Sequence, residues 1–375
     1  MGTQGRMERS SGRRAPGWRP GSLASRYDVV VVGDGVVALG VAWRLATLQP
    51  DSMVAVLAPT AVGASYDPAA AARLHLLRPE PYPTALVSRA ADVWRRWTED
   101  LVVEQPRRIT GSLTVATTVA DLVRTERSVP SVSALSVCTS LDDLTVSELL
   151  PGIDPGAVVG AWYEPEATLL EVPDLLFALA RAAADLGVDL VDGATVERLG
   201  GRPGSFELVT TVGTTTAATV IDADPSLALA VAAGLTELRV PAAFHAVRTA
   251  PVRPLLGALQ VDGTAVRQLA DGTVEVLSGA GTAPGSSGTA AVAAALRPVV
   301  EVIPALAGVS IVDIGDRSVS LTPDGLPLFG PVVDGLWATG GWGRSELDVV
   351  ALVADALATA VLDGTVEPLL EPFAP

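Results

Sequence analysis

Two glycines near the start of the chain follow a run of apolar residues, in an order that could hold the phosphates of a dinucleotide. The run at 28–32 predicts a buried strand, Gly33-Asp34-Gly35-Val36-Val37-Ala38 follows it, and residues 39–48 have helical apolar spacing. Gly33 permits the tight turn, Gly35 lets the backbone approach a diphosphate, and the N-terminus of the helix that follows presents backbone N–H groups. We therefore expect a dinucleotide at this turn.

The second strand of this unit lacks the acidic residue that commonly follows it. The apolar run at 53–57 is followed by Ala58, where an Asp or Glu would bind the ribose hydroxyls. Losing one charged hydrogen-bonding partner costs about 1.5–3 kcal/mol, or about ten- to a hundredfold in affinity. Thr60 offers a lesser hydroxyl, and Asp34 adds a negative charge near the diphosphate. The pattern indicates a site that is weakened and still present.

Composition excludes several classes of partner and chemistry. The chain has 375 residues, a net charge of −16 and one cysteine, Cys138. So acidic a chain should repel nucleic acid and anionic membranes, and no apolar run reaches the roughly 18–20 residues of a membrane helix. A single cysteine forms no internal disulfide, which fits a cytoplasmic protein. All 26 basic residues are arginines, so no Schiff-base lysine is possible. We predict no metal site.

Several later segments resemble those of one family, in the same order along the chain. These are Gly63-Ala64-Ser65 with four alanines at 69–72, Tyr163-Glu-Pro-Glu-Ala-Thr-Leu-Leu-Glu-Val-Pro, Gly193-Ala-Thr-Val-Glu-Arg-Leu, Thr322-Pro-Asp-Gly-Leu-Pro-Leu-Phe-Gly and Leu336-Trp-Ala-Thr-Gly-Gly-Trp-Gly. Together with the glycine turn they resemble the D-amino-acid oxidase, glycine oxidase and monomeric sarcosine oxidase (DAO) family of FAD proteins. The resemblance covers roughly residues 27–375.

The resemblance implies an α/β fold: a Rossmann-like FAD-binding domain of the glutathione-reductase type and a second, antiparallel-sheet substrate domain. The FAD domain should be discontinuous, built from 27–82, 150–235 and 316–375. Residues 83–149 and 236–315 should form the domain that covers the flavin. The Arg-rich segment 1–26 should be a disordered tail, because it is also rich in Gly, Ser and Pro.

The resemblance also implies which residues hold FAD. Val196 should place its backbone against the adenine, and Arg317 stands where sarcosine-oxidase-like members attach their flavin through a cysteine, so we expect FAD to bind non-covalently. The expected cofactor-binding residues are Gly33, Gly35, Val36, Val37, Thr60, Ala64, Ser65, Val196, Ala223, Gly340, Gly341 and Gly343.

The implied reaction is oxidation of a C–N bond in a small amine or amino-acid-like substrate, by hydride transfer to the flavin. The carboxylate of such a substrate needs a cationic clamp, and arginine offers bidentate geometry. Arg317, just before the C-terminal signature, and Arg78 are the candidates for this clamp, and Trp342 is the third candidate catalytic residue. The sequence identifies neither the substrate nor the oligomeric state.

One departure from the family keeps other functions open. Where the family reads Val-Val-x-Ala-Ala/Thr-Gly-Ala-Trp beside the cofactor, this chain reads Val220-Ile-Asp-Ala-Asp-Pro-Ser-Leu. Pro225 removes a backbone donor, and Asp224 adds a carboxylate. A redox-inactive relative, acting as a cofactor-free cyclase or isomerase or as a binding protein, is therefore an alternative. A third alternative, an NAD-dependent dehydrogenase, fits the C-terminal segments less well.

Overall fold

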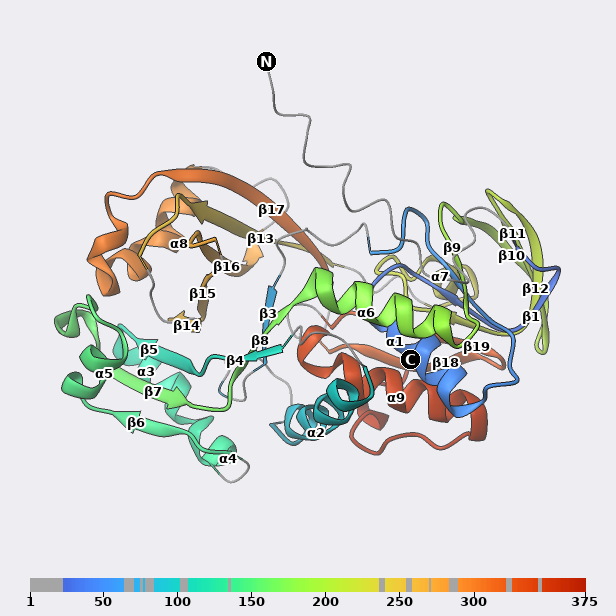
Figure 1. Ribbon diagram of the computed structural model, residues 1–375, viewed down its shortest axis with the longest axis horizontal. Helices are drawn as coiled ribbons and strands as arrows, with labels where there is room; N and C mark the ends of the chain where they lie inside the picture. Colours follow the sequence, from blue (N-terminus) through green and yellow to red (C-terminus); the bar gives the residue numbers. More distant parts are fainter. Residues whose placement is uncertain are drawn as a thin grey trace, which may run out of the picture.

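Two large sheets lie at opposite ends of the molecule, and the long strands β13 and β17 run from one body towards the other (Figure 1). The computed structural model describes residues 23–63, 71–74, 77, 84–101, 107–133, 136–235, 240–253, 258–269, 271–282, 289–321, 326–342 and 346–375. Residues 1–22 of the predicted tail lie outside the described residues, and β1 begins at Arg26.

The first sheet contains the predicted strand–turn–helix unit. Its strand order is β10-β11-β12-β1-β2-β9, and β19 and β18 extend it beside β12. The pairs β12–β1, β1–β2, β2–β9 and β12–β19 are parallel, and the other pairs are antiparallel. The strands are β1 Arg26–Val32, β2 Val54–Leu57, β9 Asp189–Val191, β10 Val196–Arg202, β11 Ser205–Thr210, β12 Gly213–Asp222, β18 Leu328–Val333 and β19 Leu336–Gly340.

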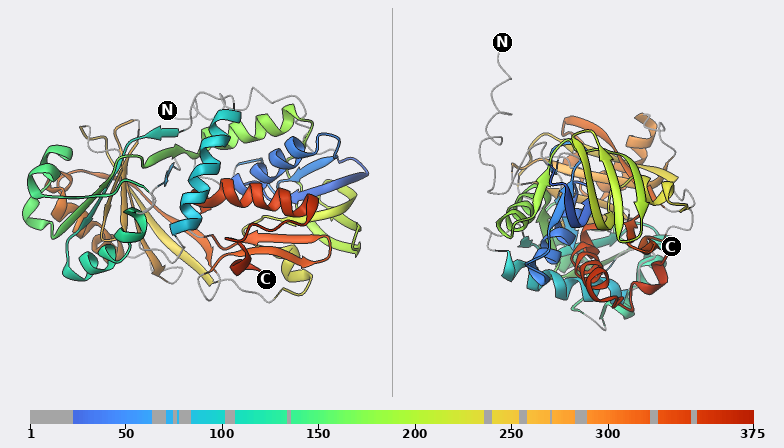
Figure 2. Two further views of the ribbon diagram at one scale, coloured as in Figure 1. Left: turned by 90° about the horizontal axis from the view of Figure 1, so that it is seen from below. Right: turned by 90° about the vertical axis from the view of Figure 1, so that its right-hand side faces the viewer.

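Helices cover one face of this sheet, as Figure 2 shows from below. They are α1 Val36–Leu48, α2 Thr84–Asp100, α6 Val172–Asp185 and α9 Glu346–Asp363. Val29 and Val31 of β1 pack with these helices, and Val30 and Val32 pack in a separate cluster on the other face with residues of β11 and β12. Burial on both faces explains why residues 29–32 of β1 are continuously apolar rather than alternating.

The second sheet has the order β17-β13-β16-β15-β14-β5-β7-β6. Its pairs are antiparallel, as expected, except for the parallel pair β14–β5. The strands are β5 Ser112–Ala116, β6 Thr139–Leu141, β7 Gly160–Glu164, β13 Val240–Thr249, β14 Ala258–Val261, β15 Thr264–Gln268, β16 Val274–Thr282 and β17 Ile311–Leu321.

Alternate residues of these strands, among them Val247, Val266 and Val276, pack against α8 (Thr289–Val302) in a second core. The shorter helices are α3 Val119–Glu126, α4 Val129–Ser133, α5 Asp143–Leu149, α7 Ala228–Ala232 and the 3₁₀ turns at Pro155–Ala157, Pro304–Leu306 and Glu371–Phe373.

A small sheet lies between the two large ones. It has the order β3-β8-β4, formed by β3 Ala71–Leu74, β8 Thr168–Glu171 and β4 Arg107–Ile109 (Figure 1). Two strands cross the domain limits expected from the sequence: β7 pairs in the second sheet although it lies within 150–235, and β17 spans position 316. The division into a cofactor domain and a covering domain stays a prediction. Among the described residues, none of the helices has the length and apolar character needed to span a membrane.

Candidate cofactor site

The turn between β1 and α1 presents a helix N-terminus that no side chain caps. Gly35 is the N-cap residue of α1, and the first helical turn contains no acidic residue. Gly33 has φ +139°, and a Cβ atom there would lie 2.9 Å from the carbonyl oxygen of Ala223 and 3.3 Å from the Cβ of Ala38. Only glycine fits this close approach. The N–H groups of the helix start therefore stay available to a ligand phosphate.

The residue after β2 cannot bind a ribose through its side chain. Val32, Leu57 and Val191, the last residues of β1, β2 and β9, are in register, so the residues that follow them share one sheet edge. At this edge Ala58 is fully buried, its N–H donates to the Val191 carbonyl at 3.0 Å, and its carbonyl accepts from Ala194 N–H at 2.8 Å. Ala58 therefore contributes only a buried methyl group.

Two carboxylates flank this position and fasten the loop that follows β2. The Thr60 hydroxyl lies 3.3 Å from Oδ2 of Asp34, which is 2% exposed. Asp192, directly after β9, accepts the N–H of Val62 at 2.9 Å through Oδ1. In addition, Gly193 N–H donates to the Thr60 carbonyl at 2.9 Å. Thr60 is thus held between the ends of β1 and β9.

The predicted departure from the family forms a turn of its own. Ser226 N–H donates to Oδ1 of Asp224 at 2.7 Å, and Leu227 N–H donates to the Asp224 carbonyl at 2.9 Å. Asp at the first position of a β-turn and Pro at the second, here Pro225, are favoured residues. The turn therefore satisfies its polar groups without the donor that Pro225 lacks.

Asp222 anchors the helix that follows this turn. Its Oδ2 accepts the backbone N–H groups of Leu229 and Ala230 in α7, each at 3.0 Å. Burial, helped by the neighbouring charge of Asp224, raises the pKa of Asp222 to about 6 even though the hydrogen bonds from α7 oppose the shift. Sequence reasoning missed the roles of Asp192 and Asp222. The signal was an acidic residue next to the end of an apolar strand.

Gly340, which ends β19, lies against the same turn, and Gly341 follows it. A Cβ atom on Gly340 would lie 3.1 Å from Cδ1 of Leu227, whose φ of 46° is left-handed, and Gly341 has φ +73°. Trp342 is 3% exposed; its indole N–H donates to the Thr339 hydroxyl at 2.9 Å and its ring packs edge-on against Phe373 with centroids 5.7 Å apart. Trp342 thus lies in the core between the first sheet and its covering helices, where it supports the Gly340–Gly341 segment.

The structure brings most of the described cofactor candidates to one sheet edge. They are Gly33, Gly35, Val36, Val37, Thr60 and Ala223, with Gly340 and Gly341 beside the Leu227 turn. Val196 begins β10, two residues after Ala194, whose N–H donates a hydrogen bond to the Ala58 carbonyl. Ala64, Ser65, Arg78 and Gly343 lie outside the described residues.

Arg317 lies on a different element from the turn. Its backbone is in β17, opposite Phe244 of β13, and its side chain lies outside the description.

A buried ion cluster in the second sheet was not foreseen. Arg248, Glu275 and Arg267 stand opposite one another on β13, β16 and β15. Glu275 is fully buried; Nη2 of Arg248 lies 3.2 Å from its Oε1, and Arg267 pairs with its Oε2. These guanidinium groups already serve a protein carboxylate. The signal was a single charged residue directly after a valine in each strand, as in Val247-Arg248, Val266-Arg267 and Val274-Glu275.

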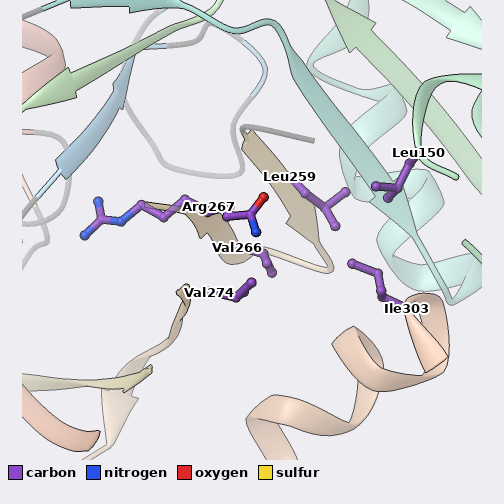
Figure 3. Close-up of a pocket in the computed structure, with 7 residues that line it drawn as sticks. Leu150, Leu259, Val266, Arg267, Val274 and Ile303 are labelled. Atoms are coloured by element: carbon purple, nitrogen blue, oxygen red, sulfur yellow. The ribbon is translucent and has the colours of Figure 1, made fainter. Parts of the chain in front are cut away.

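A small pocket in the same sheet lies on the other side of the β14–β15 hairpin. Its lining is mainly apolar, and Figure 3 shows Arg267 pointing away from Leu259, Val266 and Ile303. The part of the chain that the structure describes contains no group of three or more His, Cys, Asp or Glu residues that could hold a metal ion.

The residues at the first sheet edge fit a dinucleotide diphosphate, since the start of α1 is uncapped and Gly33 has no room for a side chain. The bifunctional protein ThiO/ThiG of Synechocystis sp. is 25% identical over 371 residues, which cover 94% of this chain and 54% of that protein. This chain therefore spans about half the length of that relative.

Two solved structures share the fold along nearly the whole chain. Glycine oxidase from Geobacillus kaustophilus is 22% identical with a TM-score of 0.82, over 94% of this chain and 98% of that one. L-proline dehydrogenase from P. horikoshii is 17% identical with a TM-score of 0.80, over 93% and 96%. The family model "DAO: FAD dependent oxidoreductase" matches residues 28–360. The chain therefore belongs to the DAO family of FAD-dependent oxidoreductases.

Proposed function

We propose that the protein binds FAD non-covalently and oxidises a C–N bond of an amine or amino-acid-like substrate. The observation that carries this proposal is the glycine turn at Gly33, which packs against Ala223 and precedes the uncapped start of α1. The chain also matches the family model. When bound, FAD supplies the hydride acceptor. The protein then needs to orient the substrate and provide the electrostatic environment, and few acidic or basic catalytic residues are required.

The proposed cofactor contacts come from the sheet edge. Backbone N–H groups at Gly35, Val36 and Val37 would hold the diphosphate, because four N–H groups at a helix start have no partner within the helix. Ala64, Ser65 and Val196 are proposed along the remainder of the cofactor, and Ala223, Gly340, Gly341 and Gly343 where small residues let the backbone approach.

The proposed substrate clamp is Arg317 together with Arg78. A guanidinium group binds a carboxylate through two parallel hydrogen bonds, which fixes orientation as well as charge. Arg248 and Arg267 are poorer candidates because Glu275 already pairs with both. Trp342 enters the proposal as a positioning residue, through its bond to Thr339 and its place beside Gly341.

The names of the structural neighbours suggest which substrates to try first. One is a glycine oxidase and one is an L-proline dehydrogenase. We propose a small amino acid or secondary amine of this kind as the substrate class. A cytoplasmic location also remains part of the proposal.

The first test is the visible absorbance spectrum of the purified protein, before and after incubation with FAD and desalting. We expect a flavin spectrum at about one FAD per chain, released into the supernatant by acid precipitation. Anaerobic addition of glycine, sarcosine, L-proline or larger amino acids should then bleach it. Flavin that stays with the precipitate would contradict non-covalent binding. A colourless protein that refuses FAD would overturn the proposal and favour a redox-inactive relative.

The role of Arg317 is tested by comparing two arginine variants. Arg317→Gln should raise KM for a carboxylate substrate and leave the flavin spectrum unchanged, because one bidentate partner is lost and the cofactor contacts remain. The matched control is Arg202→Gln, at the exposed end of β10. Equal effects of the two variants would remove Arg317 from the clamp.

A further inference from the structure

We propose that Thr60 and Asp34 together replace the missing ribose acid: the Thr60 hydroxyl accepts a hydrogen bond from a ribose hydroxyl of the FAD adenosine, and Asp34 holds it ready to do so. This inference rests on the proposed function, because it concerns the same cofactor. Thr60 is the contact residue, and Asp34 is a positioning residue that acts through it.

The position of the pair follows from the strand register. A ribose acid normally follows the second strand of the βαβ unit, next to the glycine turn. Val32 and Leu57 are in register, so Asp34 from the turn and Thr60 from the loop after β2 meet at that edge. Ala58, which occupies the place of the acid, is fully buried and offers only a methyl group.

Burial divides the two roles. Asp34 is 2% exposed, so a ligand at the surface does not reach it, whereas Thr60 is exposed. A hydroxyl has one proton to donate and two lone pairs. When the Thr60 proton points to Asp34, those lone pairs are left for a ribose hydroxyl. A carboxylate acceptor at one end also strengthens the next bond in such a chain.

The loop geometry keeps the Thr60 hydroxyl at this place. The Thr60 carbonyl accepts Gly193 N–H at 2.9 Å, and Val62 N–H donates to Asp192 at 2.9 Å, so the backbone is fixed on both sides of Ala61. The Thr60 hydroxyl has two acceptors within reach, Asp34 Oδ2 at 3.3 Å and the Ala61 carbonyl at 3.5 Å. Both distances are long for an O–H···O bond. Asp34 is the favoured acceptor of the Thr60 proton because it is charged and lies closer.

The effect of Asp34→Asn on FAD affinity distinguishes this inference from simple charge repulsion, because the two predict changes in opposite directions. If Asp34 only repelled the diphosphate, Asp34→Asn would tighten FAD binding. If Asp34 positions Thr60, the same variant weakens it. Asp224→Asn is the matched control, since it removes the carboxylate of the residue after Ala223, which packs on Gly33, and Asp224 has no contact to Thr60 among the described residues.

The experiment measures dissociation constants of the apoprotein for FAD by flavin fluorescence, and for ADP, 2′-deoxy-ADP and 3′-deoxy-ADP by calorimetry. We expect Thr60→Val to weaken FAD and ADP by about three- to tenfold, and Thr60→Ser to restore them. Asp34→Asn should weaken both ligands, and Asp224→Asn should not. The wild-type protein should prefer ADP over one of the deoxy nucleotides by the same factor, and Thr60→Val and Asp34→Asn should lose that preference.

The possible failures are distinguishable. A wild-type protein that binds neither FAD nor ADP overturns both the proposed function and this inference. If the wild-type protein binds FAD but does not prefer ADP over either deoxy nucleotide, the inference alone is overturned. The same holds if the Asp34→Asn variant binds FAD more tightly than the wild type. Melting curves of the apo variants, which should match the wild type within a few degrees, show that weaker binding does not come from unfolding.

Discussion

A Cβ atom added to Gly33 would lie 2.9 Å from the carbonyl oxygen of Ala223. This distance ties the glycine turn after β1 to the residue after β12, and Ala223 N–H returns the link by donating to the Val32 carbonyl at 2.9 Å. The ends of β1 and β12 are therefore linked in both directions, and both position the start of α1.

Gly33→Ala should destabilise the protein and abolish FAD binding. The substitution adds the clash with Ala223 to a φ of +139° that side chains rarely adopt, for a combined cost of about 2–4 kcal/mol. The measurement is the urea midpoint together with FAD retention. Gly364→Ala is the control, because Gly364 has φ +79° and no atom near its added Cβ; it should cost about 1 kcal/mol and keep FAD. Equal losses would show that the contact with Ala223 is unimportant.

Asp222 should make stability fall as the pH rises from about 4 to about 6. Its folded pKa of about 6 lies above the unfolded value of 3.8, so the folded state binds the extra proton in that window. The loss over the window is about 3 kcal/mol. Asp222→Asn cannot titrate, so its unfolding free energy minus that of the wild type should increase with pH over the same range. A pH-independent difference, measured by urea unfolding from pH 4 to pH 7, would contradict the assignment.

An acid with the opposite shift provides the comparison. Hydrogen bonds from Thr273 lower the pKa of Asp271, so its contribution is present above its unfolded pKa and is lost as the pH falls through the folded value. Asp271→Asn should therefore change the pH dependence with the opposite sign to Asp222→Asn.

Removing the carboxylate of Glu275 should be among the most damaging changes in the second sheet. Glu275 is fully buried between Arg248 and Arg267, so Glu275→Gln removes the buried charge that pairs with both guanidinium groups, at about 3–5 kcal/mol. The matched control is Glu207→Gln, which breaks the exposed pair with Arg198 and should cost less than about 1 kcal/mol. Thermal unfolding of both variants checks this, and similar melting temperatures would refute it.

Cys138 should react slowly with thiol reagents in the folded protein. Burial raises its pKa to about 11, and the charge of Glu164 contributes to the rise. Compared with the ordinary value of 9.0, the thiolate fraction near pH 8 falls about a hundredfold. The chain has no other cysteine, so the time course of reaction with a disulfide reagent reports this residue alone. Denaturant should restore the ordinary rate, and Glu164→Gln should raise it in the folded state. Fast labelling of the native protein would contradict the raised pKa.

The sequence alone was sufficient for the features that depend on short stretches of chain. The predicted strand at 28–32, the glycine turn and the helix after it are confirmed as β1 and α1, because apolar period and turn glycines act within about twenty residues. The family resemblance and its fold class are also confirmed, because each motif is a short stretch and the motifs keep their order along the chain. The proposed roles of Arg317, Arg78 and Trp342 stay predictions.

Only the tertiary structure decided which polar groups meet across long separations. Thr60 comes to Asp34, Val62 to Asp192 and Arg248 to Glu275 through strand register, which depends on every pair in a sheet at once. The same register buried Ala58 and Asp222 next to the glycine turn. In the sequence, Pro225 suggested a damaged site. In the structure it belongs to a turn whose hydrogen bonds come from neighbouring residues. These hydrogen bonds can be identified only once the positions of all the partners are known.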